Sequence, residues 1–270
     1  MNQQALRELT TIALSAARAA GTTIKDMRER GQVDVSFKSE KDLVTNADLR
    51  AEEIIIQKIR SHFPSHSFLT EESAPDVTGE KQLRSPLWII DPIDGTANYA
   101  HGHTQVAVSI AFADEGSVLS GVVHAPFQGE TFVGMKGLGA TLNDKAIAPR
   151  SIRELKLALV ATGFPAVRPA QEHMVKQVAA ALTRCRDIRR LGSAALDISW
   201  VACGRLDAYC EPVRAWDMAA AGLIAREAGA RTGSIKAIPA GQIMPPDLYA
   251  EDFYVAAPGI YDELRSVLDL

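Results

Sequence analysis

Two aspartates stand three residues apart in a stretch that also holds proline and glycine, Trp88-Ile-Ile-Asp-Pro-Ile-Asp-Gly-Thr96. Asp91 follows an apolar run, Pro92 cannot donate to a strand ladder, and Asp94-Gly95 is a turn sequence. A stiff turn of this kind holds carboxylate oxygens in place, and hard divalent cations such as Mg2+ prefer oxygen ligands. The helix predicted to begin at Thr96 offers free N–H groups that favour an anion such as phosphate. The stretch therefore indicates metal-assisted phosphoryl chemistry, although taken alone it is equally consistent with an ordinary Asp-Gly turn.

Further acidic residues lie where predicted elements begin or end: Asp48 in the first turn of a helix, Glu71 and Glu72 after a strand, and Asp217 at the start of another helix. Like charges this close repel one another unless cations neutralise them, so the placement is typical of a metal site. Of the two adjacent glutamates only one can face a cleft from an extended chain, and we predict that it is Glu71. For Asp48 the alternative is a first-turn carboxylate that only stabilises its helix.

The length and composition of the chain limit the classes of protein to consider. It has 270 residues, of which 47% are apolar, enough for one large domain or two closely packed ones. Its net charge is −4 and it has no basic tract, which argues against a broad nucleic-acid-binding face. Three cysteines without metal-ligand spacing are expected to be reduced thiols. No apolar run is long enough for a membrane span and the first residues are polar, so a cytoplasmic protein is expected.

Hydrophobic periodicity predicts the elements that must position these residues. Apolar residues at helical spacing predict a long helix over 3–30, and alternation predicts a half-buried strand at Val33, Val35 and Phe37. A second helix is predicted to begin at Thr45 as its N-cap. The first half is expected to be helices packed on a largely antiparallel sheet. Strands are predicted over 67–70, 87–90, 105–112 and 118–124, with a polar loop over 73–85 and a hairpin over 130–142.

The pattern changes near Pro149, where strands begin to alternate with helices. Strands are predicted over 155–162, 187–191, 206–211 and 253–257, and helices over 171–185, 194–203, 216–230 and 261–268. Alternation of this kind predicts a second α/β layer set. We therefore predict an N-terminal α+β half, residues 1–149, with most of the metal ligands. A C-terminal α/β half, residues 150–270, would carry the substrate-specificity residues and one metal ligand, and the halves would share a cleft.

Four sequence blocks together resemble the signature sequences of the inositol monophosphatase family: Leu43-Val-Thr-Asn-Ala-Asp48, Thr70-Glu-Glu-Ser73, the stretch 88–96, and Ala215-Trp-Asp-Met-Ala-Ala220. The blocks occur in the order of the family and span most of the chain. The resemblance implies a mixed α+β and α/β fold, a layered αβαβα sandwich of the sugar-phosphatase type. It also implies a lithium-sensitive, Mg2+-dependent phosphomonoesterase that hydrolyses inositol 1-phosphate or another small phosphorylated substrate and usually forms a homodimer.

The resemblance implies a site for two to three Mg2+ ions. Glu71, Asp91 and the carbonyl of Ile93 would hold the first ion. Asp91, Asp94 and Asp217 would hold the second, with Asp91 as the bridge, and a third, weaker ion would lie near Glu71 through waters. Two such ions can activate water and neutralise the leaving oxygen in an in-line displacement.

The same resemblance implies the remaining catalytic roles. Thr96 and Asp48 would orient the nucleophilic water, with Glu71 as a further catalytic residue. The N–H groups of Gly95 and Thr96 would bind the phosphate. Lys38 is either an ordinary exposed lysine or a residue at the mouth of the cleft.

Substrate specificity is expected from the second half. Gly192-Ser193-Ala194 resembles the helix start that faces the sugar or inositol ring, and Glu211 resembles the glutamate that accepts ring hydroxyls. The segment from Glu211 to Asp217 is one residue shorter than is usual in the family, and Pro212 stiffens it. A carboxylate turned away from the cleft and paired with Arg214 is therefore an alternative for Glu211. Arg214 could also meet a second anionic group.

Other substrates and another class of function stay open at this point. Residues 231–251 lack the glycine-rich turn usual after the last core helix, which indicates a rearranged substrate rim or dimer contact. Relatives that act on fructose 1,6-bisphosphate, histidinol phosphate or a 3′-phosphonucleotide are alternatives, although Ile93 suits inositol phosphatases better than nucleotidases, which usually have leucine there. The alternative of another class is a binding partner of the transcription machinery, for which the acidic chain gives no direct support.

Overall fold

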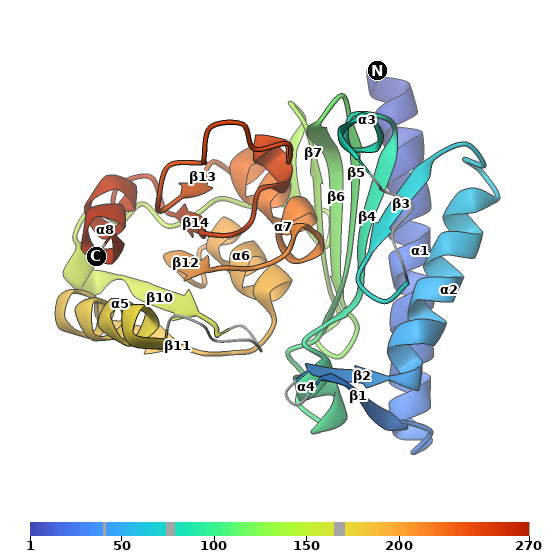
Figure 1. Ribbon diagram of the computed structural model, residues 1–270, viewed down its shortest axis with the longest axis horizontal. Coiled ribbons are helices and arrows are strands. Elements are labelled where there is room, and N and C mark those ends of the chain that lie inside the picture. The colour runs from blue at the N-terminus through green and yellow to red at the C-terminus, as the bar shows by residue number, and fades with distance from the viewer. Residues whose placement is uncertain (40–41, 74–78, 165–170, 270) are drawn as a thin grey trace.

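A computed structural model describes residues 1–39, 42–73, 79–164 and 171–269 of the chain. Its elements stack in five layers (Figure 1): a helix pair, a seven-stranded sheet, a second helix pair, a five-stranded sheet, and a third helix pair. This order confirms the layered αβαβα sandwich. Within the described ranges, no helix combines the length and the apolar character that crossing a membrane requires.

The outer helix pair consists of α1 (Gln3–Glu29) and α2 (Asn46–Arg60). Asn2 caps α1, since its side chain accepts a hydrogen bond from the N–H of Ala5 at 2.9 Å. Thr45 caps α2, as predicted, and the N–H of Thr45 in turn donates to Asp48, which completes a capping box. The apolar faces of both helices pack on one face of the seven-stranded sheet.

The seven-stranded sheet has the order β3-β4-β5-β6-β7-β8-β9, with β3 parallel to β4 and the other neighbours antiparallel. Its central strands are continuous apolar runs because both faces are covered. Trp88 and Ile90 pack toward α1 and α2, whereas Leu87 and Ile89 pack toward the second helix pair. The strands are β3 (Ser67–Thr70), β4 (Leu87–Asp94), β5 (Ala107–Asp114), β6 (Ser117–Ala125), β7 (Glu130–Met135), β8 (Gly139–Leu142) and β9 (Lys145–Ala146).

Strand β4 is longer than predicted, since it does not end at Asp91 but continues to Asp94. Asp91 pairs with Ser109 and Asp94 with Ala107, so β4 has one extra residue between these pairs, which is a β-bulge. Pro92 lies in the bulge, where its missing N–H is tolerated. Gly95 then adopts φ of +95° before the short helix α4 (Thr96–Ala100), which confirms the predicted turn and helix start.

The five-stranded sheet has the order β11-β10-β12-β14-β13 and is mixed: β10 is parallel to β11 and β12, and β14 is antiparallel to its neighbours. Helices α6 and α7 lie between the two sheets, and α5 and α8 cover the outer face (Figure 1). The strands are β10 (Leu159–Thr162), β11 (Asp187–Arg189), β12 (Ala208–Glu211), β13 (Arg231–Ser234) and β14 (Phe253–Ala256). The helices are α5 (Gln171–Arg184), α6 (Ala194–Ala202), α7 (Ala215–Ala228) and α8 (Tyr261–Leu268).

The structure corrects several local predictions. The strand predicted at Val33, Val35 and Phe37 is present as β1 (Val35–Ser39), which pairs with β2 (Asp42–Thr45) in a two-stranded sheet, but its predicted half-burial is wrong, because Val35 and Phe37 are 46% and 67% exposed. The strand predicted over 155–162 begins with the 3-10 turn η1 (Leu155–Leu157).

Regular structure also occurs in two segments predicted as loops. A short helix α3 (Glu80–Leu83) lies in the predicted polar loop, of which residues 74–78 are outside the described part. The tail contains β13 and the 3-10 turn η2 (Pro246–Leu248). The division of the chain near residue 150 stays a prediction.

Candidate active site

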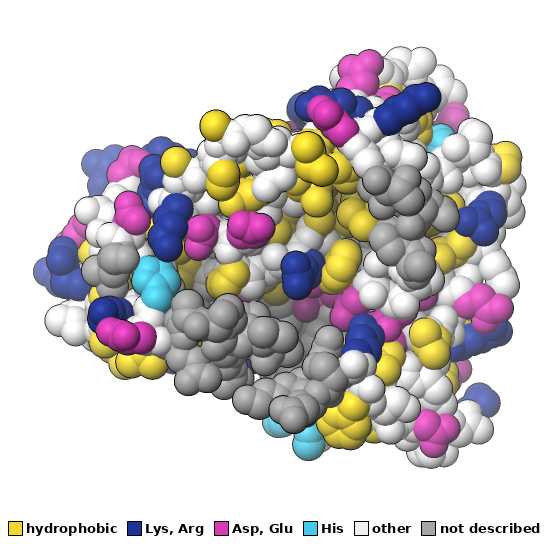
Figure 2. Space-filling view, in the orientation of Figure 1, with side chains coloured by type: hydrophobic (Ala, Val, Ile, Leu, Met, Phe, Trp, Pro, Cys, Tyr) yellow, Lys and Arg dark blue, Asp and Glu magenta, His cyan; other side chains and the backbone are white. Residues whose placement is uncertain are grey.

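Three aspartates from two elements form the centre of the site. Asp91 and Asp94 flank the bulge of β4, and Asp217 lies in the first turn of α7. Each offers a carboxylate oxygen, and these oxygens lie within 4.8 Å of one another. Asp91 and Asp94 are buried and Asp217 is partly buried. Figure 2 shows acidic side chains in the depression between the seven-stranded sheet and the C-terminal elements, with basic side chains beside them.

The electrostatics of this cluster oppose its ionisation. Burial, together with the charges of neighbouring carboxylates, raises the pKa of Asp91 and of Asp217 well above the usual range. Burial raises the pKa of Asp94 to about 6, against hydrogen bonds that lower it. An all-oxygen set of donors that resists carrying its charges unaided fits a divalent cation, which would neutralise them.

Asp94 also joins β4 to α6. Its Oδ2 accepts hydrogen bonds from Ser193 Oγ at 2.5 Å and from the N–H of Ala195 at 2.7 Å, and its Oδ1 accepts from the N–H of Ala194 at 3.2 Å. Asp94 therefore satisfies the first turn of α6, which has no side-chain cap of its own. The donors that we expected to face a substrate ring, at Ser193 and Ala194, are directed at Asp94 in this structure.

The predicted water-orienting pair is assembled beside the cluster. Thr96 Oγ1 lies 3.1 Å from Asp48 Oδ1 and 3.1 Å from the carbonyl oxygen of Ile93, and it can donate to either. The other oxygen of Asp48 accepts from the backbone N–H and the hydroxyl of Thr45, at 2.8 and 2.5 Å. Burial raises the pKa of Asp48 to about 6. The capping box of α2 thus orients a carboxylate toward Thr96.

The two glutamates after β3 differ in exposure. The side chain of Glu71 is 21% exposed and lies close enough to Asp91 to raise the pKa of that carboxyl, whereas the side chain of Glu72 is 2% exposed. Lys38 on the β1–β2 hairpin bridges both, with its Nζ 3.1 Å from Glu71 Oε1 and 2.7 Å from Glu72 Oε1. These partners raise the pKa of Lys38 against the effect of its burial. Lys38 is therefore ion-paired beside Glu71, which favours the mouth of the cleft over an unpaired position on the surface.

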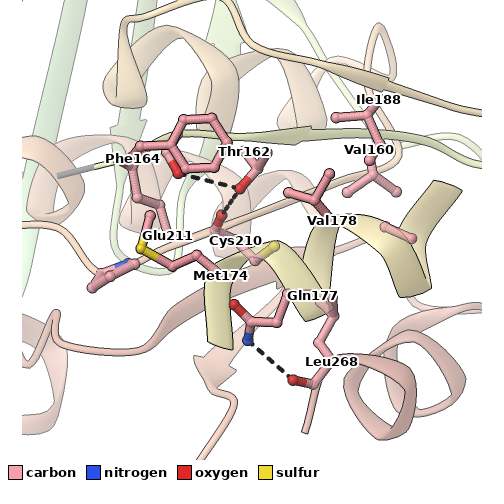
Figure 3. Close-up of a pocket in the computed structure, with 13 residues that line it drawn as sticks. Val160, Thr162, Phe164, Met174, Gln177, Val178, Ile188, Cys210, Glu211 and Leu268 are labelled. Carbon is pink, nitrogen blue, oxygen red and sulfur yellow. Dashed lines mark hydrogen bonds between the residues drawn. The ribbon is translucent and has the colours of Figure 1, made fainter. Parts of the chain in front are cut away.

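Among the described contacts, Glu211 is not paired with Arg214, so the structure does not support the alternative in which Glu211 turns away from the cleft toward that arginine. The hydroxyl of Tyr209 donates to Glu211 Oε2 at 2.5 Å, while Arg214 contributes its backbone N–H to Asp217 at 2.7 Å. Burial raises the pKa of Glu211 to about 7, and the charge of Arg190 opposes this rise. Glu211 also borders a cavity of about 20 Å³ next to α5 (Figure 3), which is room for about one water molecule and not for a substrate.

Sequence analysis missed two buried acids near the site, Glu52 on α2 and Asp197 on α6, which are 4% and 2% exposed. Burial, together with the charges of Asp94 and Glu211, raises the pKa of Asp197, and its Oδ1 has no hydrogen-bond partner among the described residues. The helical pattern places both acidic residues at positions that face the core. An acidic residue at such a position is unusual and would have indicated a buried, functional or structural carboxylate.

We expect the cation-free protein to lose stability as the pH rises from about 4 to about 6. In the folded protein, Asp48 and Asp94 have pKa values of about 6, above the ordinary value of 3.8. Their contribution to stability is therefore complete at low pH and disappears as the pH rises through the folded pKa. Thermal unfolding at several pH values, in chelator and in excess MgCl2, checks this. A bound cation should reduce the pH dependence, and identical profiles with and without Mg2+ would contradict the expectation.

Comparisons with known proteins identify the family of the chain. The chain matches the family described as "Inositol monophosphatase family" over residues 5–266. It is 40% identical over 230 residues to "Nus factor SuhB" of Pasteurella multocida (strain Pm70), which covers 83% of this chain and 84% of that protein. The solved structure of extragenic suppressor protein suhB from Bartonella henselae has a TM-score of 0.86 at 32% identity, covering 96% of this chain and 97% of that one. Inositol monophosphatase from Anabaena (Nostoc) sp. PCC 7120 has a TM-score of 0.80 at 33% identity, covering 97% and 96%. The chain therefore belongs to the inositol monophosphatase family.

Proposed function

We propose that this chain is a Mg2+-dependent phosphomonoesterase that hydrolyses a small phosphate ester, with inositol 1-phosphate as the preferred candidate. The observation that carries the proposal is the cluster of Asp91, Asp94 and Asp217 next to the hydrogen-bonded pair of Thr96 and Asp48. Such a cluster can hold cations beside a water that Thr96 orients, which is the arrangement that hydrolysis of a phosphate ester needs. Belonging to the family supports the same reaction class.

In this proposal, each residue of the site has a separate role in binding cations, water or phosphate. Glu71, the three aspartates and the carbonyl oxygen of Ile93 would hold two to three Mg2+ ions, which supply Lewis-acid stabilisation and a more acidic water when bound. Asp48, held by Thr45, would accept a hydrogen bond from the Thr96 hydroxyl, so that the hydroxyl oxygen accepts a hydrogen bond from the attacking water. The N–H groups of Gly95 and Thr96 would hold the phosphate in line with that water.

The identity of the alcohol is the finer part of the proposal. Glu211 would face the alcohol, and a buried carboxylate already bonded to Tyr209 suits ring hydroxyls as donors. The segment Gly192-Ser193-Ala194 would border the same alcohol, while the Ser193 hydroxyl and the N–H of Ala194 stay bonded to Asp94. One solved relative is an inositol monophosphatase by its title, which supports the inositol ester. We also propose that lithium inhibits the protein and that it forms a homodimer, since the resemblance to the family implies both.

A panel of phosphomonoesters tests this function. With Mg2+ present, we expect hydrolysis of inositol 1-phosphate to exceed that of fructose 1,6-bisphosphate, histidinol phosphate and a 3′-phosphonucleotide. Chelation should abolish phosphate release and added Mg2+ should restore it, because the carboxylates bind the ester only through cations. Phosphate release at the full rate in excess chelator would contradict the metal assignment. Preference for another ester would keep the reaction class and change the substrate.

Replacement of Thr96 by alanine should separate catalysis from metal binding. The hydroxyl that contacts Asp48 would be lost while every carboxylate of the cluster remains. We expect kcat to fall by about 10²–10⁴-fold, the range for loss of positioned acid–base help, with little change in Mg2+ affinity. Thr22→Ala on the exposed face of α1 is the matched control. A kcat near wild type in Thr96→Ala would exclude the Thr96–Asp48 pair from catalysis.

A second candidate function is a role in transcription, favoured by the name "Nus factor SuhB" of the Pasteurella multocida relative. The test is binding of the purified protein to bacterial RNA polymerase, measured for the wild type and for Glu71→Gln. If this function exists, Glu71→Gln should lose phosphatase activity and keep binding, because a docking surface does not need the metal ligand. Absence of binding by both proteins would contradict it.

A further inference from the structure

Glu52 holds the turn that carries Glu71. It lies on α2, four residues after Asp48, and its side chain is buried. Glu52 Oε2 accepts a hydrogen bond from the backbone N–H of Glu72, and Oε1 accepts one from the N–H of Ser73, both at 3.0 Å. One carboxylate therefore binds two successive N–H groups directly after Glu71. Bonds of this charge-assisted kind are stronger than those between neutral groups.

The turn is held from both sides of Glu71. On the preceding side, the N–H of Glu71 donates to the carbonyl oxygen of Ile90 at 3.3 Å, which extends the pairing of β3 with β4. On the following side, Glu52 fixes the next two residues. The backbone of Glu71 is therefore clamped between a strand and a helix, and its carboxylate lies close enough to Asp91 for the two groups to interact.

We propose that Glu52 is a positioning residue that sets the affinity of the site for divalent cations by fixing Glu71 against Asp91. This inference rests on the proposed function, in which Glu71 is a metal ligand. Groups that orient metal ligands without touching the metal contribute strongly to affinity, since a ligand that is free to move must be ordered when the ion binds. Because Asp48 and Glu52 are one turn apart on one helix face, α2 would align the water-orienting pair and the metal ligand together.

Only a carboxylate of this length performs the role. Glutamine has one acceptor oxygen and an NH2 group, so one of the two backbone N–H groups would face a donor. Aspartate keeps both oxygens but is one methylene shorter, so it cannot reach both N–H groups from the same helix. Glu53, the next residue, gives a matched control: it is an exposed glutamate on α2 that pairs with Arg50.

The test compares Mg2+ binding by the full chain in the wild type, Glu52→Gln and Glu53→Gln. Calorimetric titration with MgCl2 measures affinity, and thermal unfolding in chelator measures the stability of each variant. We expect Glu52→Gln to bind Mg2+ about 10–100-fold more weakly, the range seen when groups that orient ligands are removed. Glu53→Gln should bind like the wild type.

Each outcome decides between the alternatives. Wild-type affinity in a folded Glu52→Gln, with or without a lower unfolding temperature, would overturn the positioning role and leave Glu52 as a structural residue. If Glu52→Gln does not fold, Glu52→Asp replaces it: weakened binding supports the inference and unchanged binding overturns it. A wild type that binds no Mg2+ would overturn both this inference and the proposed function, whereas equal binding by the wild type and the variants would overturn the inference alone.

Discussion

Carboxylates that are buried close together repel one another, and this repulsion is the constraint on which the arrangement of the structure depends. Asp91 and Asp94 of β4 meet Asp217 of α7, from a distant part of the chain, where burial raises the pKa of each. A fold can keep such a group together only if rigid elements prevent the side chains from moving apart. The bulge of β4, the first turn of α7 and the cap of α6 are those elements.

Close packing of α7 on the seven-stranded sheet makes the arrangement rigid. A side chain at Gly121 of β6 would bring its Cβ to 2.5 Å from the carbonyl oxygen of Ala220, so the helix backbone rests directly on the strand. Ser109 Oγ of β5 donates to the carbonyl oxygen of Trp216 at 3.0 Å, which fixes the first turn of α7 beside its own aspartate. Asp217 is therefore held at a set distance from the two aspartates of β4.

Much of the fold and most of the cluster could be predicted from the sequence, since both depend on local patterns. Helical spacing predicted α1, alternation predicted β5 and β6, and acidic residues at element ends predicted the members of the cluster. Alternation at Val35 and Phe37 predicted a strand, but alternation cannot say whether another layer covers one face. The clamp at Glu72 and Ser73 could not be predicted, because it depends on a residue about twenty positions earlier in the chain.

The cap that Asp94 provides for α6 links two parts of the molecule thermodynamically. Its oxygens accept hydrogen bonds from the first turn of the helix and also belong to the acidic cluster. The position of this one carboxylate therefore affects both the conformation of the helix start and the binding of an ion to the cluster. A ligand that displaces the first turn of α6 would move Asp94 and so change the positions of the oxygens that an ion binds. An ion that moves Asp94 would in turn change the hydrogen bonds of that first turn. By reciprocity, the factor by which one raises or lowers the affinity for the other is the same in both directions. Occupancy of the two sides of the cleft is then a cooperative property of the fold and not of either side separately.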